Sequence, residues 1–200
     1  MKTSKAYWTE RAKNISDIKA VTHADIHQRD LEINSLIKHL RTNEKVVDIG
    51  CGNGYSTRMF SKYCDSILGL DFVPDMIERA KKENHGENIR YEVGDVLNLI
   101  LPEKPNLVIT QRCLINLLSL DMQKQAISNI AFSLPKDGRF LMLEGVNDGR
   151  DGINKCRIKL GLLPLKTVDY NLDFEMEKTN KFLQSIFDII EIKRFGIYEF

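Results

Sequence analysis

The chain of 200 residues is nearly balanced in charge, with 29 basic and 28 acidic side chains and a formal net charge of +1. This balance disfavours a phosphate-rich polymer as a partner, although it permits a local basic patch. No apolar run reaches the roughly 20 residues of a membrane span, and the start lacks the apolar core of a signal peptide. We therefore expect one cytoplasmic domain over residues 1–200, without a membrane or nucleic-acid partner.

The cysteines lie far apart and form neither a Cys-x-x-Cys pair nor a Cys/His cluster with the spacing of zinc ligands. Free thiols and no metal site are expected from this spacing. The four residues are Cys51, Cys64, Cys113 and Cys156.

Short apolar runs alternate with helical patterns along the chain, which predicts parallel βαβ units. Residues 30–41 come first, because their apolar side chains repeat at helical spacing on one face. Strands are expected at 45–49, 66–70, 89–93, 106–110 and 139–143. Helices are expected between them at 55–63, 74–83 and 121–134, the second with Pro74 in its first turn.

The region Gly145–Asp173 is irregular and rich in Gly, Asn and Asp. Such a long irregular stretch is usually functional, and we expect it to carry a helix near residues 154–160. A strand is expected at 188–195. Few residues follow it, so a final partner strand is expected to be missing, or to be a short stub after Gly196. With a missing strand, the chain would be truncated, or would dimerise or borrow a segment to cover the edge.

The stretch KVVDIGCGNGYSTRMF, Lys45–Phe60, places a glycine at every second position directly after the first strand. Three Cβ atoms are missing from one turn, so something must approach its backbone closely. A dinucleotide fingerprint would need a small residue where Tyr55 or Thr57 stands, and the Gly-Lys-Ser/Thr of a P-loop is absent. What remains is Asp-x-Gly-x-Gly-x-Gly before a helix whose amide groups suit a carboxylate. This pattern is typical of S-adenosylmethionine sites.

Two further acids follow neighbouring strands. Asp71 closes the second strand in ILGLDFVPDM, about 20 residues beyond the glycines, where a carboxylate can accept hydrogen bonds from ribose hydroxyls. Asp95 follows the third strand in YEVGDVLNL, at the edge where an open α/β sheet binds its ligand. The alternative for each acid is a role in a turn or helix cap. Together with the glycine loop, the two acids are more specific than any one feature.

With these motifs, the sequence resembles the class I S-adenosylmethionine-dependent methyltransferases over roughly residues 30–145. VVDIGCGNG is similar to their motif I, LDFVPDMI to the acidic-loop motif and VGDVLNL to the adenine-binding motif. The resemblance implies a Rossmann-like, doubly wound, mostly parallel α/β sheet with helices on both faces. It also implies S-adenosylmethionine as the cofactor and S-adenosylhomocysteine as the product.

The family's roles transfer to matching positions of this sequence. The resemblance implies that the glycine loop contacts the methionine moiety, Asp71 holds the ribose, Phe72 flanks the adenine and Asp95 meets the adenine amino group. The cofactor-binding residues expected on this basis are Asp48, Gly50, Cys51, Gly52, Gly54, Asp71, Phe72, Asp95, Val96 and Gln111.

The domain divides into four expected parts. Residues 1–29 form an N-terminal lid, in which Tyr7 and Trp8 begin a helix over the cofactor or simply pack in the core. Residues 30–144 form the cofactor-binding core. Residues 145–173 form an insertion on the acceptor side, and residues 174–200 supply the final helix and strand.

Methyl transfer is an in-line displacement, so few acid or base groups are required. A hydroxyl acceptor would benefit from a base, for which His23, His27 and Glu144 are candidates. The histidines in THADIHQRD can also be read as part of a polar capping segment, and Glu144 as an exposed acid at a strand end. The catalytic residues expected are Glu144, Arg112 and His27.

The acceptor pocket is expected beyond the carboxyl ends of the fourth and fifth strands. Arg112, Asn116, Glu144 and Arg157 should line it together. A basic cluster that includes Arg157 could grip an anionic acceptor, or could be a solvated face. The stretches ITQRCLINLL, LEGVNDG and NKCRIKLGLLPL resemble small-molecule methyltransferases of sugar and polysaccharide biosynthesis.

The function predicted from the sequence is methyl transfer to oxygen or nitrogen of a small molecule, such as a sugar or another biosynthetic intermediate. The alternative is a Rossmann-like NAD-linked oxidoreductase or a noncatalytic cofactor-binding module. A macromolecular acceptor is a third possibility, of which RNA is disfavoured by the near-neutral charge. A homodimer is also considered.

Overall fold

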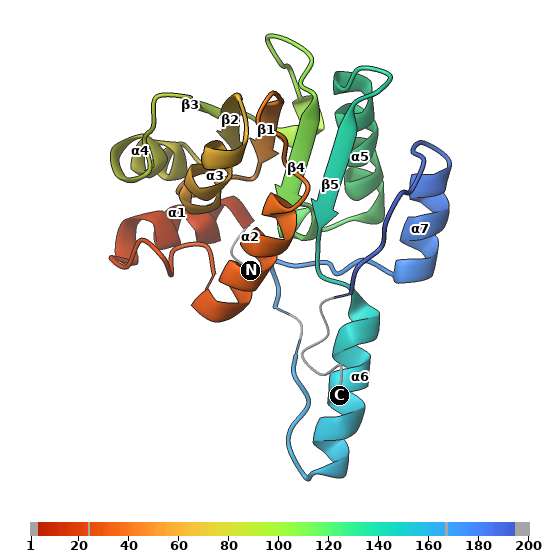
Figure 1. Cartoon of the computed structure of the whole chain (residues 1–200). Coiled ribbons are helices and arrows are strands. Elements are labelled where there is room, and N and C mark those ends of the chain that lie inside the picture. Colours follow the sequence, from red (N-terminus) through yellow and green to blue (C-terminus); the bar gives the residue numbers. More distant parts are fainter. Residues whose placement is uncertain (1–3, 24, 167, 195–200) are drawn as a thin grey trace.

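The computed structural model describes residues 4–23, 25–166 and 168–194. A five-stranded parallel sheet with the order β3-β2-β1-β4-β5 forms its centre (Figure 1). The chain winds outward from β1 first to one side and then to the other, which is the doubly wound arrangement. The strands are β1 (Lys45–Ile49), β2 (Ser66–Asp71), β3 (Ile89–Val93), β4 (Leu107–Gln111) and β5 (Arg139–Leu143).

Seven α-helices are found within the described residues. Local chemistry fixes several of their starts: the Asp25 side chain accepts from two backbone amides at the start of α2, Ser119 caps α5, and Pro74 stands in the first turn of α4. The helices are α1 (Ser4–Asn14), α2 (Ile26–Ile37), α3 (Tyr55–Phe60), α4 (Pro74–Glu83), α5 (Leu120–Ser133), α6 (Asn147–Lys159) and α7 (Met176–Gln184).

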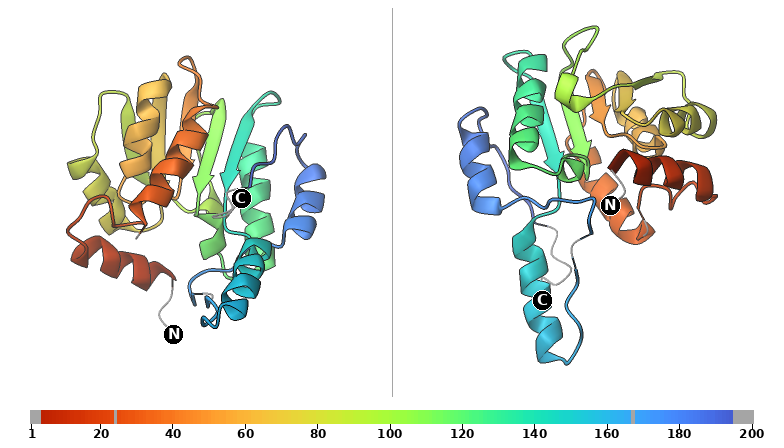
Figure 2. Two further views of the ribbon diagram at one scale, coloured as in Figure 1. Left: turned by 60° about the horizontal axis from the view of Figure 1, so that its bottom comes forward. Right: turned by 180° about the vertical axis from the view of Figure 1, so that it is seen from behind.

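Helices cover both faces of the sheet (Figure 2). Along β4, Leu107 and Ile109 point into the core that contains α2 and α3, while Val108 points into the core beneath α5 and α7. This alternation follows from the two-residue period of a strand. Burying one such side chain stabilises the fold by about 1.5–3 kcal/mol. The middle strands are therefore apolar on both faces, as a parallel sheet requires.

The expected strands at 45–49, 89–93 and 139–143 are confirmed with their bounds, and β2 and β4 differ by a residue. The expected helix at 30–41 is wrong at both ends, because Asp25 starts α2 four residues earlier and Lys38 ends it. The helix expected near 154–160 is longer, and begins at Asn147.

The strand expected at 188–195 is wrong within the described residues, because no strand lies between 188 and 194; residue 195 lies outside them. Phe187 packs on Phe140 of β5, with ring centroids 5.7 Å apart. The next apolar side chains do not continue this contact: Ile190 is 92% exposed. The segment therefore follows β5 without joining the sheet. A homodimer formed through this edge stays a prediction.

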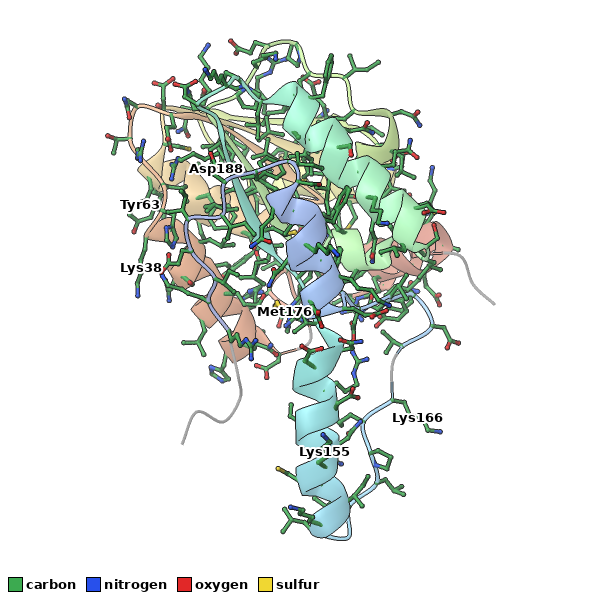
Figure 3. The ribbon with its side chains drawn as sticks, turned by 90° about the vertical axis from the view of Figure 1, so that its right-hand side faces the viewer. Lys38, Tyr63, Lys155, Lys166, Met176 and Asp188 are labelled. Atoms are coloured by element: carbon green, nitrogen blue, oxygen red, sulfur yellow. The ribbon has the colours of Figure 1, made fainter. Side chains whose placement is uncertain are left out.

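Helix α6 projects from the sheet, and the chain returns beside it before α7 (Figures 1 and 3). The strand arrowheads of β4 and β5 point toward the root of this projection and toward α1 (Figure 1). The loops that leave the strands therefore meet α1 and the root of α6 at one edge. None of the described helices combines the length and the apolar character needed to cross a membrane.

Candidate functional site

A pocket of about 240 Å³ lies at the carboxyl edge of the sheet. The loops after β1, β2 and β4 form its floor, since the carboxyl ends of parallel strands meet at one edge. Trp8 of α1, and Tyr170 and Asn171 from the segment after α6, also line the pocket. It is thus built from segments far apart in the sequence.

The glycine loop after β1 adopts backbone conformations that side chains disfavour. Gly50 and Gly54 have φ of 77°, and Gly52 has φ of 56°. A Cβ atom on Gly50 would lie 2.4 Å from Cys113 Sγ, and one on Gly52 would lie 2.3 Å from Thr22 Cγ2. The close approach predicted from the glycine spacing is real, but the neighbours are protein side chains at these two positions.

Asp71 joins this loop to the end of β2. Its Oδ2 accepts a hydrogen bond from the Gly52 amide at 2.9 Å, and its Oδ1 accepts one from the Val73 amide at 2.9 Å. Each carboxylate oxygen keeps a further lone pair. Burial raises the pKa of Asp71 to about 6, against the opposing effect of the two amides. Asp71 both shapes the loop and presents acceptor capacity to the pocket.

Asp48 of β1 lies beneath the same loop. Thr57 Oγ1 donates a hydrogen bond of 2.6 Å to its Oδ2, and burial raises the pKa of Asp48 to about 7. Thr57 thus uses its hydroxyl at a place where a dinucleotide fingerprint requires a small residue. The departure from that fingerprint has a structural cause.

Arg112, which lines the pocket, forms an ion pair with the buried Glu32. Glu32 of α2 is 1% exposed, and its Oε1 accepts from Arg112 Nη2 at 2.6 Å and Arg112 Nε at 2.9 Å. Its Oε2 accepts from Gln111 Nε2 at 2.9 Å. Arg112 has φ of 53°, a left-handed conformation that is strained for a residue with a Cβ. Because an unpaired buried charge is costly, this pairing ties α2 to the loop after β4.

His23 lines the pocket near this pair. Its Nδ1 accepts a hydrogen bond from the Asp25 amide at 3.1 Å, so the neutral ring carries its proton on Nε2. Burial, assisted by the positive charge of Arg112, lowers the pKa of His23. His23 is therefore a neutral hydrogen-bond donor at neutral pH.

Another part of the pocket lining consists of aromatic and amide side chains. Tyr7 stacks on Tyr170 with ring centroids 3.9 Å apart, and their hydroxyls are 2.9 Å apart. Trp8 Nε1 donates to Asn116 Oδ1 at 2.8 Å. Asn171 Oδ1 is buried and has no hydrogen-bond partner among the described residues. A buried acceptor without a donor is unusual, and suits a ligand group that donates.

Residues 46–138 match the family model of a methyltransferase domain. This segment forms a class I S-adenosylmethionine-dependent methyltransferase domain. S-Adenosylmethionine is therefore its cofactor. The expectations of fold and cofactor drawn from the motifs are confirmed.

Two curated relatives show the extent of the similarity. The chain is 29% identical over 145 residues to YcgJ of Bacillus subtilis, an uncharacterized methyltransferase. The aligned residues make up 71% of this chain and 55% of YcgJ. It is 30% identical over 115 residues to CRG1 of Saccharomyces cerevisiae, a probable S-adenosylmethionine-dependent methyltransferase. The aligned residues make up 54% of this chain and 38% of CRG1. The chain thus matches about half of these relatives' length or less.

Among solved structures, the N-methyltransferase NodS of Bradyrhizobium japonicum WM9 in complex with S-adenosylhomocysteine aligns with a TM-score of 0.65. The alignment covers 92% of this chain and 86% of NodS at 19% identity. At this identity the likeness shows a shared fold.

The methyltransferase pocket fits the cofactor by its chemistry. The left-handed Gly50 and Gly52 line the pocket, α3 begins at Gly54 with amides suited to a carboxylate, and Asp71 keeps free lone pairs. Seven of the expected cofactor residues line the pocket: Asp48, Gly50, Cys51, Gly52, Asp71, Phe72 and Gln111.

The other expected cofactor residues, Gly54, Asp95 and Val96, lie outside the pocket lining. Asp95 is exposed and accepts a hydrogen bond from the Leu97 amide at 2.9 Å, which is the turn role considered as its alternative. A contact of Asp95 with the adenine stays a prediction.

Two of the expected catalytic side chains do not line the pocket. Glu144 accepts hydrogen bonds from the amides of Cys113, Leu114 and Ile115, so it braces the turn after β4. Burial raises its pKa to about 7, and these amides oppose the rise. His27 is exposed on α2. Neither Glu144 nor His27 lines the pocket, and the geometry does not support either as the base.

The four residues expected to line an acceptor pocket together are separated. Arg112 and Asn116 line it, whereas Glu144 does not. Arg157 lies on the projecting α6, where its Nε donates to Leu163 O at 2.8 Å. The prediction of one shared wall is therefore wrong for Glu144 and Arg157, because the first turns inward and the second points along α6.

Several pocket residues carried no expectation from the sequence: Thr22, Arg29, Ser56, Met76, Ile115, Tyr170 and Asn171. Glu32, which holds Arg112, was missed as well. A signal existed for Arg29 and Glu32, because both lie next to the apolar stripe of α2 at helical spacing from Ile33 and Leu36. Tyr170 and Asn171 stand in the irregular region, where no periodicity marks them.

Proposed function

We propose that this pocket catalyses methyl transfer to oxygen or nitrogen of a small molecule, such as a sugar or another biosynthetic intermediate. The observation that carries the proposal is a single pocket that runs from the glycine loop to a wall of Trp8, Asn116, Tyr170 and Asn171. Both ends line the same cavity of about 240 Å³. A concave pocket with a few convergent polar groups is typical of small-molecule sites.

The catalytic contribution of the chain is positioning. S-Adenosylmethionine, when bound, supplies an electrophilic methyl group on a sulfonium. The glycine loop and Asp71 would hold this donor, and the opposite wall would hold the acceptor. The stacked Tyr7 and Tyr170 rings and the Trp8–Asn116 hydrogen bond hold that wall together. Orientation and exclusion of water are what an in-line displacement requires of an enzyme.

The wall is polar, and its charges are largely paired. His23 donates from Nε2, Asn171 Oδ1 can accept, and the charge of Arg112 is matched by Glu32. Hydroxyl and amine groups both donate and accept hydrogen bonds, so a neutral polyhydroxy or amine compound complements this wall. Aromatic rings beside amide groups also suit the apolar face and polar rim of a sugar ring.

An NAD-linked oxidoreductase is not supported, because the family uses S-adenosylmethionine and Tyr55 and Thr57 replace the glycines of the dinucleotide loop. A noncatalytic cofactor-binding module is the second candidate. It is disfavoured because the pocket lining extends beyond the glycine loop and Asp71 to Trp8, Asn116 and Tyr170.

The test measures formation of S-adenosylhomocysteine over a panel of sugars, sugar nucleotides and amines. Turnover with at least one class is expected. Trp8→Phe removes the donor to Asn116 but keeps an aromatic ring, so turnover should fall about tenfold while the Kd for S-adenosylmethionine changes less than twofold. Tyr63→Phe, on the far side of α3, is the control. Binding of S-adenosylmethionine without turnover on any class would favour the noncatalytic module.

A further inference from the structure

The projection formed by residues 147–166, here called the arm, has an ordered internal structure. Asn154 of α6 donates from Nδ2 to Leu165 O at 3.0 Å and accepts at Oδ1 from the Leu165 amide at 2.7 Å. Arg157 Nε donates to Leu163 O at 2.8 Å. Gly161, with φ of 71°, makes the turn between the two limbs. The returning segment is therefore held against α6.

Large apolar side chains gather at the end of the arm and remain exposed. Leu163 is 83% exposed and Leu160 is 74% exposed. Helix α6 has 13 residues, none of them buried, which gives a projection of about 20 Å at 1.5 Å per residue. We call this group the apolar tip: Ile158, Leu160, Leu162, Leu163 and Leu165. An exposed apolar cluster at the end of an ordered projection is typical of an interaction site.

The charged side chains around the apolar tip are all basic. Residues 152–168 contain four basic side chains and no Asp or Glu, although the whole chain carries a net charge of only +1. Lys155 on α6 and Lys166 on the returning segment lie on the two limbs of the arm (Figure 3). Neither lysine, nor Lys159, forms an ion pair with any described residue. The four basic residues of this segment are Lys155, Arg157, Lys159 and Lys166.

We propose that the arm docks on an anionic lipid surface, with the apolar tip in the interfacial region and the basic side chains on the lipid headgroups. Apolar side chains beside unpaired Lys and Arg are the combination that interfacial segments use. This is a surface contact, and requires no membrane span. The charge also disfavours a second copy of the arm as the occupant, because the two basic arms would repel each other.

The arm connects the apolar tip to the pocket. Arg150 in its root pairs with Asp173, and the same returning segment supplies Tyr170 and Asn171 to the pocket wall. Docking would therefore hold the acceptor side of the pocket toward the lipid surface. This consequence does not depend on the chemistry of the acceptor.

The experiment is flotation of the whole chain with lipid vesicles. Vesicles of phosphatidylcholine with roughly 30% phosphatidylserine should carry the protein, and pure phosphatidylcholine vesicles should carry much less, because each basic residue near an anionic surface adds to the attraction. Lys155→Glu/Lys159→Glu should lower the partition at least about tenfold. Lys81→Glu/Lys82→Glu, on exposed positions of α4, changes the net charge equally and should leave the partition unchanged within about twofold.

The apolar tip has its own matched pair of variants. Leu160→Ser/Leu163→Ser should abolish flotation, whereas Ile100→Ser/Phe132→Ser, which alters equally exposed side chains elsewhere, should not. Leu163→Trp should gain fluorescence quenched by brominated lipid, and Phe132→Trp should not. All of these positions are exposed, so circular dichroism should show folded variants.

Three results would overturn the proposal. The first is no flotation with anionic vesicles. The second is flotation that survives both arm variants. The third is a dimer in sedimentation velocity that Leu160→Ser/Leu163→Ser dissociates while vesicles carry none of the protein, since the tip would then cover a second copy.

Discussion

Asp71 links the shape of the glycine loop to the pocket that the loop lines. Its two oxygens hold the amides of Gly52 and Val73, so the carboxylate fixes the backbone on both sides of itself. The sequence indicated a ribose role, and the structure adds a bracing role that local motifs do not show. Variants at Asp71 must therefore separate ligand contact from loop support.

We expect Asp71→Asn to weaken S-adenosylmethionine binding about tenfold or more, because a charge-assisted hydrogen bond contributes roughly 1.5–3 kcal/mol. Titration calorimetry measures this change. Asp75→Asn on neighbouring α4, outside the pocket, is the control and should bind normally. Normal binding by Asp71→Asn would remove the ribose role, and weak binding with a lowered Tm would indicate loop support instead.

Asp48 gives a prediction about pH. Its pKa is raised from 3.8 to about 7, so between these values the folded protein holds a proton that the unfolded chain has lost. The free energy of unfolding therefore falls as pH rises through this window. Asp48→Asn removes this penalty and keeps an acceptor for Thr57.

The Tm difference between Asp48→Asn and the wild type, without cofactor, should shift in favour of the variant by a few degrees between pH 5 and pH 8. Differential scanning fluorimetry measures it, with Asp75→Asn as the control. Parallel Tm curves for the variant and the wild type would show that Asp48 does not keep its proton.

At the scale of elements, the ion pair between Glu32 and Arg112 connects α2 to the loop after β4. Removing one partner leaves a buried charge, while removing both does not. Arg112 is 33% exposed, so water offsets part of the loss.

We expect Arg112→Ala to lower the free energy of unfolding by about 2–3 kcal/mol, because Glu32 loses its main partner. Arg112→Ala/Glu32→Gln should recover part of this loss. Urea unfolding of the four proteins gives the double-mutant cycle. Additive effects of the two substitutions would show that the pair contributes no coupling energy.

The strands could be predicted because each is a short run of β-branched and apolar residues followed by a turn. Helix ends were less predictable: Asp25 starts α2 through a side-chain cap that apolar periodicity does not contain. The strand at 188–195 failed because its apolar pattern is compatible with pairing, whereas Ile190 and Ile192 remain exposed beside β5.

In the candidate site, too, some residues could be predicted from local motifs and others could not. The glycine loop and Asp71 are contiguous with strands, so local motifs found them. Tyr170 and Asn171 reach the pocket only through tertiary packing of the returning arm, and Glu32 acts on it through Arg112. Glu144 lies at the expected strand end, but its carboxylate turns toward three backbone amides. A side chain's direction at a strand end is not contained in the sequence pattern.

At the scale of the whole molecule, one pocket is assembled from segments far apart in the chain, from Trp8 to Asn171. The loops of the sheet and α1 with the segment after α6 line the same pocket, and under the proposed function the first would hold the donor and the second the acceptor.

A crystal structure of the complex with S-adenosylhomocysteine tests this division of the pocket most directly. We predict the methionine-derived moiety beside the glycine loop, the ribose hydroxyls within hydrogen-bond distance of Asp71, and space left between the ligand sulfur and the wall of Trp8, Asn116 and Tyr170. A ligand that fills the space beside Trp8 and Tyr170, or one whose ribose does not contact Asp71, would contradict the account.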